Sequence, residues 1–146
     1  MAKTYQLNGG VKLVNRIFDA MTRLGLGKAY RHILTVRGRK SGEPRSTPVD
    51  VMRVNGADWL VAGYGPVNWV RNVQAAGELT LSRAGRTRRY TAAPATPEEA
   101  VPVLRAYITQ VPVTRAYFDA TPTSPDEDVL RELPRHAVFR LSEVNT

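Results

Sequence analysis

The stretch ILTVRGRKSGEPRSTPVDVMRVNGADWLVAG, residues 33–63, contains three apolar segments separated by two turn-forming segments. Short segments rich in valine, isoleucine and leucine that lie between turn signals are typical of β-strands. Asn55-Gly56 is a strong turn signal, because both residues tolerate the positive φ angles of a two-residue hairpin turn. We therefore predict three consecutive antiparallel strands, at Ile33–Arg37, Thr47–Val54 and Trp59–Gly63.

The middle strand of this stretch shows the two-residue period of a β-sheet. Val49 and Val51 alternate with Asp50 and Met52, and successive side chains of a strand point to opposite faces. This pattern predicts a barrel wall that has one apolar side and one polar side.

The rest of the chain carries signals for further strands and for helices. Alternation and turn signals predict strands at Leu79–Ser82, Thr87–Ala93 and Ala137–Leu141. Apolar periodicity and helix-start signals predict helices at Val11–Leu24, Val67–Ala76, Thr96–Gln110 and Ser124–Leu133. Thr96 and Ser124 are each followed by proline and acidic residues, which predicts that both cap the helices that begin there.

These elements together predict one domain that covers residues 1–146. No strand-helix-strand unit carries the GxGxxG sequence of a Rossmann fold. Strands that follow one another in hairpins, with helices inserted between them, favour a barrel. We expect a mainly β fold with helices (α+β), a six-stranded antiparallel split β-barrel.

Composition excludes several kinds of site. The chain has no cysteine, so disulfides, thiolate metal sites and cysteine nucleophiles are excluded. Its two histidines, His32 and His136, are far apart in sequence, which indicates strand-end or surface residues rather than metal ligands. No apolar segment is long enough to cross a bilayer and no signal-peptide pattern occurs, so we expect a cytoplasmic protein without a metal.

The formal net charge of +8 is the strongest global signal. Such a charge favours polyanionic partners, among them nucleic acid, an anionic membrane surface and a highly charged cofactor. Nucleic acid is not expected, because the arginines are scattered and few aromatic residues lie between them.

The turn GRKSGEPR, residues 38–45, concentrates three cations in a few residues. Gly38 and Gly42 let the backbone turn tightly and bring N–H groups close to a ligand. Arg39, Lys40 and Arg45 supply positive charge, and arginine binds phosphate or carboxylate through two parallel hydrogen bonds. We interpret the turn as an anion clamp; the alternative is an ordinary solvated basic turn.

Three further groups are candidates for a ligand site. The small residues of Ala62-Gly63-Tyr64 would let a planar ligand approach the backbone after the third strand. Trp69 and Asn72 share one face of the predicted Val67–Ala76 helix, where Trp69 suits a core position or a cofactor contact. Tyr117 could donate a hydrogen bond in a pocket, or extend its hydroxyl into water.

The order of these motifs along the chain resembles that of the deazaflavin-dependent nitroreductase family. Its members are small split-β-barrel oxidoreductases that use coenzyme F420. The likeness begins with TVRGRKSG at residues 35–42 and continues with Pro44-Arg45 and Pro48. Downstream it includes Asn68-Trp69, Asn72 and the closing strand at residues 137–141. Glycines, cations and proline occur in a fixed order at a strand-turn-strand junction, which makes the cluster specific.

The resemblance implies an enzyme that transfers hydride from reduced F420 to a small electrophile such as a quinone, an enone or a nitro compound. F420 carries a phosphodiester and an oligoglutamate tail, whose negative charges suit the basic turn. The residues implied to border the cofactor are Arg39, Lys40, Ser41, Gly42, Arg45, Thr47, Pro48, Ala62, Gly63, Tyr64, Trp69 and Asn72. Tyr117 is implied to orient the substrate or to relay a proton to it.

The chain departs from the family pattern in two places. Gly63-Tyr64 stands where that type usually has Ser-Lys, and Asp50 stands where an aromatic residue often lies near the ring. Two alternatives stay open. One is a relative with little or no catalysis that binds a fatty acid or lipid at an anionic membrane, which the basic amphipathic helix Val11–Leu24 would suit. The other is a split barrel that binds FMN, because the clamp also suits a phosphate.

Overall fold

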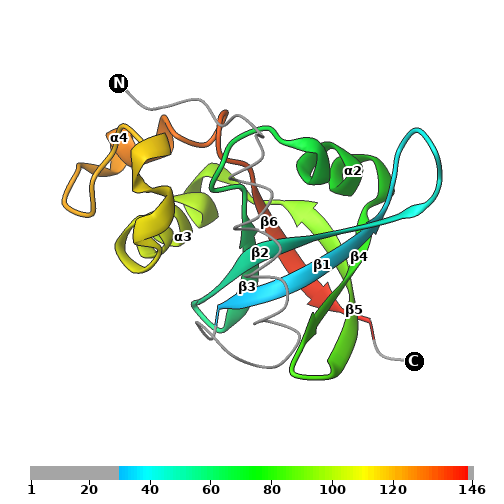
Figure 1. Cartoon of the computed structure of the whole chain (residues 1–146). Helices are drawn as coiled ribbons and strands as arrows, with labels where there is room; N and C mark the ends of the chain where they lie inside the picture. Colours follow the sequence, from blue (N-terminus) through cyan, green and yellow to red (C-terminus); the bar gives the residue numbers. More distant parts are fainter. Residues whose placement is uncertain (1–29, 145–146) are drawn as a thin grey trace.

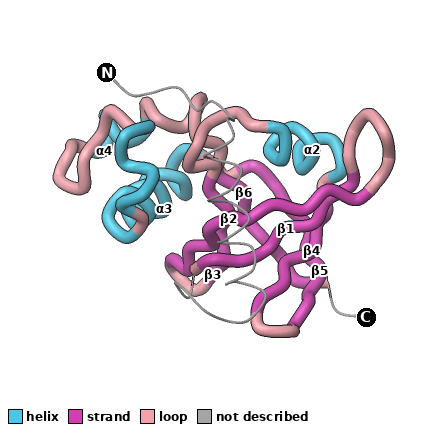
Figure 2. Tube along the Cα trace, viewed as in Figure 1, coloured by secondary structure: helices cyan, strands magenta, loops and turns pink. Residues whose placement is uncertain are grey.

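A computed structural model describes residues 30–144, and Figures 1 and 2 show how its elements are arranged. The strands are β1 (Arg31–Arg37), β2 (Pro44–Val54), β3 (Ala57–Val61), β4 (Glu78–Arg83), β5 (Arg86–Pro94) and β6 (Val138–Glu143). The helices are α2 (Asn68–Ala76), α3 (Pro97–Gln110), the 3-10 helix η1 (Pro112–Tyr117) and α4 (Asp126–Leu130). The helix expected at Val11–Leu24 lies outside the described residues and stays a prediction.

Six antiparallel strands close into a barrel, which confirms the expected fold. Their order around the barrel is β1-β2-β3-β6-β5-β4, and β4 pairs again with β1. The hairpin turns Asn55-Gly56 and Ala84-Gly85 both have φ angles of 53° and 77°. These left-handed conformations belong to the turn type whose twist matches that of the flanking strands. The ends of the strands differ from the expected ones by at most three residues.

Both faces of β2 are covered, so the expectation of one polar side was wrong. Val49 belongs to the core inside the barrel, whereas Met52 belongs to a second core outside it. Asp50 lies on the same face as Met52 and is only 6% exposed. The physical reason is that α3 packs against this outer face of β2 (Figure 1), which excludes water from it.

The two cores lie on opposite sides of the sheet. The inner core joins residues of β1, β2, β3, β4 and β6 to Val70 and Val73 of α2. The outer core packs Leu104 and Ile108 of α3 against Val61 and other residues of β2, β3 and β6. As a result, α2 and the β1–β2 turn lie together at one end of the molecule, and α3 and α4 lie at the other (Figure 1).

The expected helix after the second hairpin is present as α3, and its predicted start is confirmed. Thr96 Oγ1 accepts a hydrogen bond from the Glu99 N–H (3.2 Å). The Glu99 carboxylate in turn accepts one from the Thr96 N–H (2.9 Å). This reciprocal pair is a capping box, which satisfies two N–H groups that would otherwise have no partner in the helix.

The corresponding expectation at Ser124 was wrong. Pro125 is the N-cap of α4, and no side chain caps this helix. The Ser124 hydroxyl instead accepts a hydrogen bond from the Thr121 N–H (2.8 Å), within the preceding turn. The helix is short and ends at Leu130 rather than at Leu133, and the residues that follow it form turns.

Candidate functional site

The β1–β2 turn is held in shape by hydrogen bonds within its own backbone. The Gly38 N–H donates to the Glu43 carbonyl (2.8 Å), and the Gly42 N–H donates to the Gly38 carbonyl (2.9 Å). Ser41 Oγ also accepts a hydrogen bond from the Glu43 N–H (3.2 Å). Gly42 has a φ angle of 75°, which glycine adopts without steric cost. The turn therefore presents its cations from an ordered backbone.

Asn72 fixes Arg39 in this turn from the neighbouring helix α2. Its side-chain Oδ1 accepts hydrogen bonds from the Arg39 backbone N–H (3.1 Å) and from the Arg39 guanidinium (2.8 Å). The guanidinium also lies 3.5 Å from Oδ1 of Asn68, at the start of the helix. Because Asn72 is buried, it joins the turn to α2 and positions a cation of the clamp.

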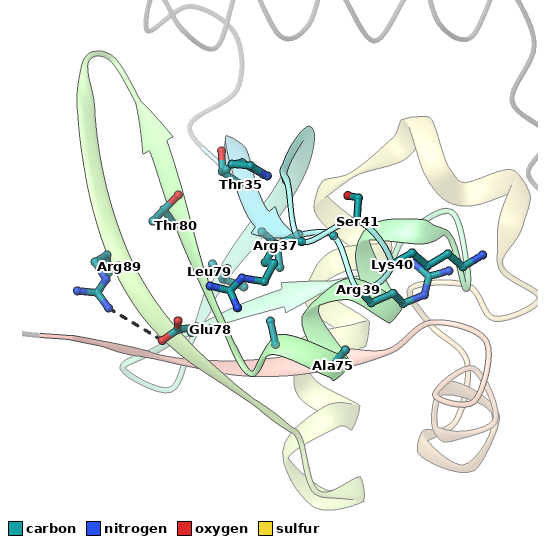
Figure 3. A pocket seen from close by; sticks show the side chains of 15 residues that line it. Thr35, Arg37, Arg39, Lys40, Ser41, Ala75, Glu78, Leu79, Thr80 and Arg89 are labelled. Atoms are coloured by element: carbon teal, nitrogen blue, oxygen red, sulfur yellow. Dashed lines mark ion pairs between the residues drawn. The ribbon is translucent and has the colours of Figure 1, made fainter.

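A pocket with a volume of about 810 Å³ lies beside the turn. Figure 3 shows side chains from the turn, the end of α2, β4 and β5 around it. Four residues that the resemblance implied line this pocket: Arg39, Lys40, Ser41 and Gly42. Five polar residues that sequence reasoning did not assign to a site line it as well: Thr35, Arg37, Glu78, Thr80 and Arg89.

Three other implied residues follow the turn along β2 and do not line this pocket. The Arg45 guanidinium stays near the turn and lies 3.4 Å from Ser41 Oγ, to which it donates. Thr47 and Pro48 are half-buried and pair with residues of β1 further along the strand. Only the first part of the implied anion site therefore borders the pocket.

A second group of implied residues gathers where β3 ends. The rings of Tyr64 and Tyr117 meet edge to face, with centroids 5.2 Å apart. His136 joins the two segments, because its Nδ1 lies 2.7 Å from the Ala62 carbonyl oxygen and its Nε2 lies 2.8 Å from the Tyr117 carbonyl oxygen. The fold thus brings Ala62, Tyr64 and Tyr117 together.

Sequence reasoning expected His136 at the end of a strand or on the surface; it is buried rather than on the surface, and its role in positioning this group was missed. It is 2% exposed and stacks on the Phe118 ring at 3.7 Å. Burial lowers the pKa of His136, and the two carbonyl contacts act in the opposite direction. The neutral ring donates to only one of the two carbonyls. No sequence signal marks this role, because the partners of His136 are Ala62, which follows β3, and Tyr117 at the end of η1.

Gly63 has a steric reason for differing from the usual serine. A Cβ atom at Gly63 would overlap the Tyr107 hydroxyl and would lie 3.0 Å from a methyl group of Thr114. The buried Tyr107 hydroxyl donates to Asp50 Oδ2 (3.0 Å), and Asp50 Oδ1 accepts from Arg31 Nε (2.7 Å). Burial raises the pKa of Tyr107 well above its ordinary value, so the hydroxyl keeps its proton. Tyr107 therefore occupies the space that a side chain at position 63 would need.

Trp69 lies on α2 but does not border the pocket. It is half-buried, packs against the inner core and tilts towards the Phe139 ring, with centroids 6.3 Å apart. These contacts favour the core interpretation of Trp69.

The described part of the chain contains neither a candidate metal site nor a candidate membrane-spanning helix. In residues 30–144, no three His, Asp or Glu side chains are grouped so that they could hold a metal ion. No helix of the same range is long and apolar enough to span a bilayer. The lipid-binding alternative depended on the helix at Val11–Leu24, which the structure does not describe.

The closed barrel, the basic turn and the tyrosine pair can be compared with known proteins. The family model of the F420H2-dependent quinone reductases matches residues 12–124. The chain belongs to this family. It is therefore an oxidoreductase, with coenzyme F420 as its cofactor. The matched range contains the turn, the end of β3, α2 and Tyr117.

Solved structures share the fold of this quinone reductase family member. One described as a domain-swapped dimer is 20% identical over 90% of this chain and 95% of that chain, with a TM-score of 0.59. The F420-H2 dependent reductase FDR-A is 20% identical over 78% of this chain and 95% of that chain, with a TM-score of 0.56. The heme storage protein HutZ from Vibrio cholerae is 10% identical over 90% and 88%, with a TM-score of 0.52. No curated protein matched the chain.

Proposed function

We propose that this chain binds F420 with the anionic tail on the β1–β2 turn and the deazaflavin ring near the end of β3, and that it reduces a quinone. Other small electrophiles, such as an enone or a nitro compound, are the next candidates. When bound in its reduced form, F420 supplies a hydride. The protein binds and orients the two reactants, and a quinone also takes up a proton to become a hydroquinone.

The pocket beside the turn is the observation that carries this proposal. Its volume of about 810 Å³ suits a large ligand. None of its lining residues is aromatic, whereas four of them are cations. This lining suits a flexible anionic chain and offers no surface on which a ring could stack. Lys40 has no ion pair or hydrogen bond within residues 30–144, so its charge is available to a ligand.

The end of β3 is the proposed place of the ring. Ala62 and Gly63 are buried there, so the partly exposed rings of Tyr64 and Tyr117, which form an aromatic edge beside them, are the surface proposed to meet the ring. We assign to the Tyr117 hydroxyl the role of orienting the substrate or giving it a proton. The segment from Ala62 to Asn68 connects this place with the clamp, because Asn68 lies 3.5 Å from the Arg39 guanidinium.

The first test is a titration of the purified protein with F420 at several salt concentrations. We expect binding at low salt that weakens as salt is added, because added ions screen the tail from the cations. Absence of binding at low salt would contradict the proposed function.

Replacement of clamp residues tests the assignment of the tail. Lys40→Ala combined with Arg45→Ala should weaken F420 binding about two- to tenfold and flatten its salt dependence, because two exposed charge contacts are lost. Arg131→Ala is a control for the loss of one positive charge elsewhere, since Arg131 follows α4 at the other end of the molecule (Figure 1). Unchanged affinity in the double variant would exclude the turn as the clamp.

A further inference from the structure

The pocket extends from the clamp onto the outer face of the barrel. Thr35 of β1 pairs with Thr80 of β4, which pairs with Arg89 of β5. Cross-strand partners point to the same face of a sheet. The neighbours of Thr35 and Thr80 along their strands belong to the inner core, so Thr35, Thr80 and Arg89 point outwards. All three line the pocket (Figure 3).

The same alternation places two more charged residues on this face. Arg37 lies two residues after Thr35, and Glu78 lies two residues before Thr80. In antiparallel strands these two positions therefore lie opposite each other, just beyond the last pair. Arg89 reaches Glu78 from the third strand, with 4.0 Å between guanidinium nitrogen and carboxylate oxygen. Glu78 thus lies between two arginines.

The charges of this group are only weakly satisfied within the protein. The Arg89–Glu78 pair is long, and both side chains are more than half exposed, so the pair contributes little to stability. The Arg37 side chain has no hydrogen bond or ion pair within residues 30–144. Among the residues that line the pocket, Glu78 is the one carboxylate, against four cations.

We propose that Arg37 and Arg89 form a second anion subsite, which binds glutamate carboxylates of the cofactor tail beyond those held at the clamp. This inference rests on the proposed function and deepens it. A short tail ends at Arg39 and Lys40, whereas a longer tail continues along the outer face of β1, β4 and β5. The subsite therefore makes the affinity for F420 increase with the number of glutamates.

Glu78 limits this effect. Its carboxylate occupies the space between the two arginines and repels the carboxylates of a ligand, because like charges at short distance interact unfavourably. Removal of its charge therefore strengthens binding of a long tail. A variant that is only damaged in its fold would not gain affinity, so the sign of this change separates the subsite from a structural effect.

The test compares F420 with a short tail, F420 with a long tail and the deazaflavin chromophore without any tail, in fluorescence titrations at low salt. Arg37→Gln and Arg89→Gln should each weaken binding of the long-tailed form about two- to fivefold and leave the short-tailed form unchanged. Glu78→Gln should tighten binding of the long-tailed form by a similar factor. Arg131→Gln, which changes the net charge equally at the opposite end, should change neither.

Three outcomes would overturn the subsite. They are equal affinity of the wild type for long and short tails, unchanged long-tail affinity in both arginine variants, and equal weakening of both forms in those variants. Failure of the proposed function looks different, because the wild type would then bind neither tailed form at low salt.

Discussion

At the scale of single residues, the identity of Gly63 is set by a side chain far away in the sequence. Tyr107 comes from α3, and its hydroxyl is held against Gly63 by Asp50. Asp50 is in turn bound to Arg31. A serine at position 63 would have to displace this buried network, and buried polar groups that lose partners cost stability. The glycine in place of the family's usual serine is therefore a packing adjustment, which does not extend to Tyr64 in place of the lysine.

Substitution of Gly63 tests this explanation. Gly63→Ala should lower the free energy of unfolding by about 1–3 kcal/mol, because the new methyl group overlaps the Tyr107 hydroxyl. Tyr107→Phe removes that hydroxyl, so the double variant should lose clearly less stability than the sum of the two single variants. Urea unfolding of all four proteins measures the coupling. Additivity within about 0.5 kcal/mol would show that the two residues act independently.

At the scale of elements, two side chains connect segments that no local signal relates. Asn72 joins α2 to the basic turn through Arg39. His136, just before β6, joins the end of β3 to the end of η1 through two carbonyl groups. Each contact fixes one end of the proposed cofactor site to a neighbouring element. The geometry of the proposed site thus depends on these two contacts as well as on the barrel.

His136 should make the stability of the protein depend on pH. Burial lowers its folded-state pKa below the ordinary value of 6.5, so the unfolded chain takes up a proton first as the pH falls. Its contribution is therefore present above pH 6.5 and is lost as the pH falls towards the folded-state pKa. The half-buried His32 is shifted in the same direction and adds to this loss.

The measurement is urea unfolding between about pH 7.5 and about pH 5.5. At the higher pH, His136→Gln should cost about 1–3 kcal/mol, because a buried carbonyl contact is impaired. Since glutamine does not titrate, the variant should lose less further stability than the wild type as the pH falls. An equal loss in both proteins would show that His136 does not carry this pH dependence. His32→Gln is the matched control for the second histidine.

At the scale of the whole molecule, the two hydrophobic cores support different parts of the structure. The inner core builds the barrel and holds α2 beside the basic turn, while the outer core attaches α3 and α4 at the other end. The net charge of +8 attracts a polyanion to the whole surface. The pocket beside the turn then supplies the local geometry that a general positive charge lacks.

Binding of F420 should stabilise the whole domain. A ligand that binds only the folded state at about 100 times its dissociation constant adds about 2.7 kcal/mol. For a chain of this length, that increase should raise the melting temperature by about 5–10 °C. Thermal unfolding with and without F420 measures the shift, which should shrink in high salt as the tail is screened. A shift that salt leaves unchanged would argue against recognition of the tail by charge.

The sequence by itself determined the features that depend on neighbouring residues. The six strands, the Asn55-Gly56 hairpin and the capping box at Thr96 follow from alternation, φ preferences and local hydrogen bonds. The basic turn at residues 38–45 likewise indicated the family, because its glycines and cations are contiguous. Ser124 shows the limit of such signals, since its hydroxyl serves the preceding turn instead of the helix.

Only the tertiary structure decided which distant residues share a site. Closure of the barrel places Arg37, Glu78 and Arg89 around one pocket, and the packing of α3 buries Asp50 and brings Tyr107 against Gly63. His136 likewise acquires its partners from two other segments. These contacts depend on strand register and on the covering of one face of the sheet by a helix. Neither can be predicted from the local pattern of the chain, because each is stabilised by contacts between segments that are far apart in sequence.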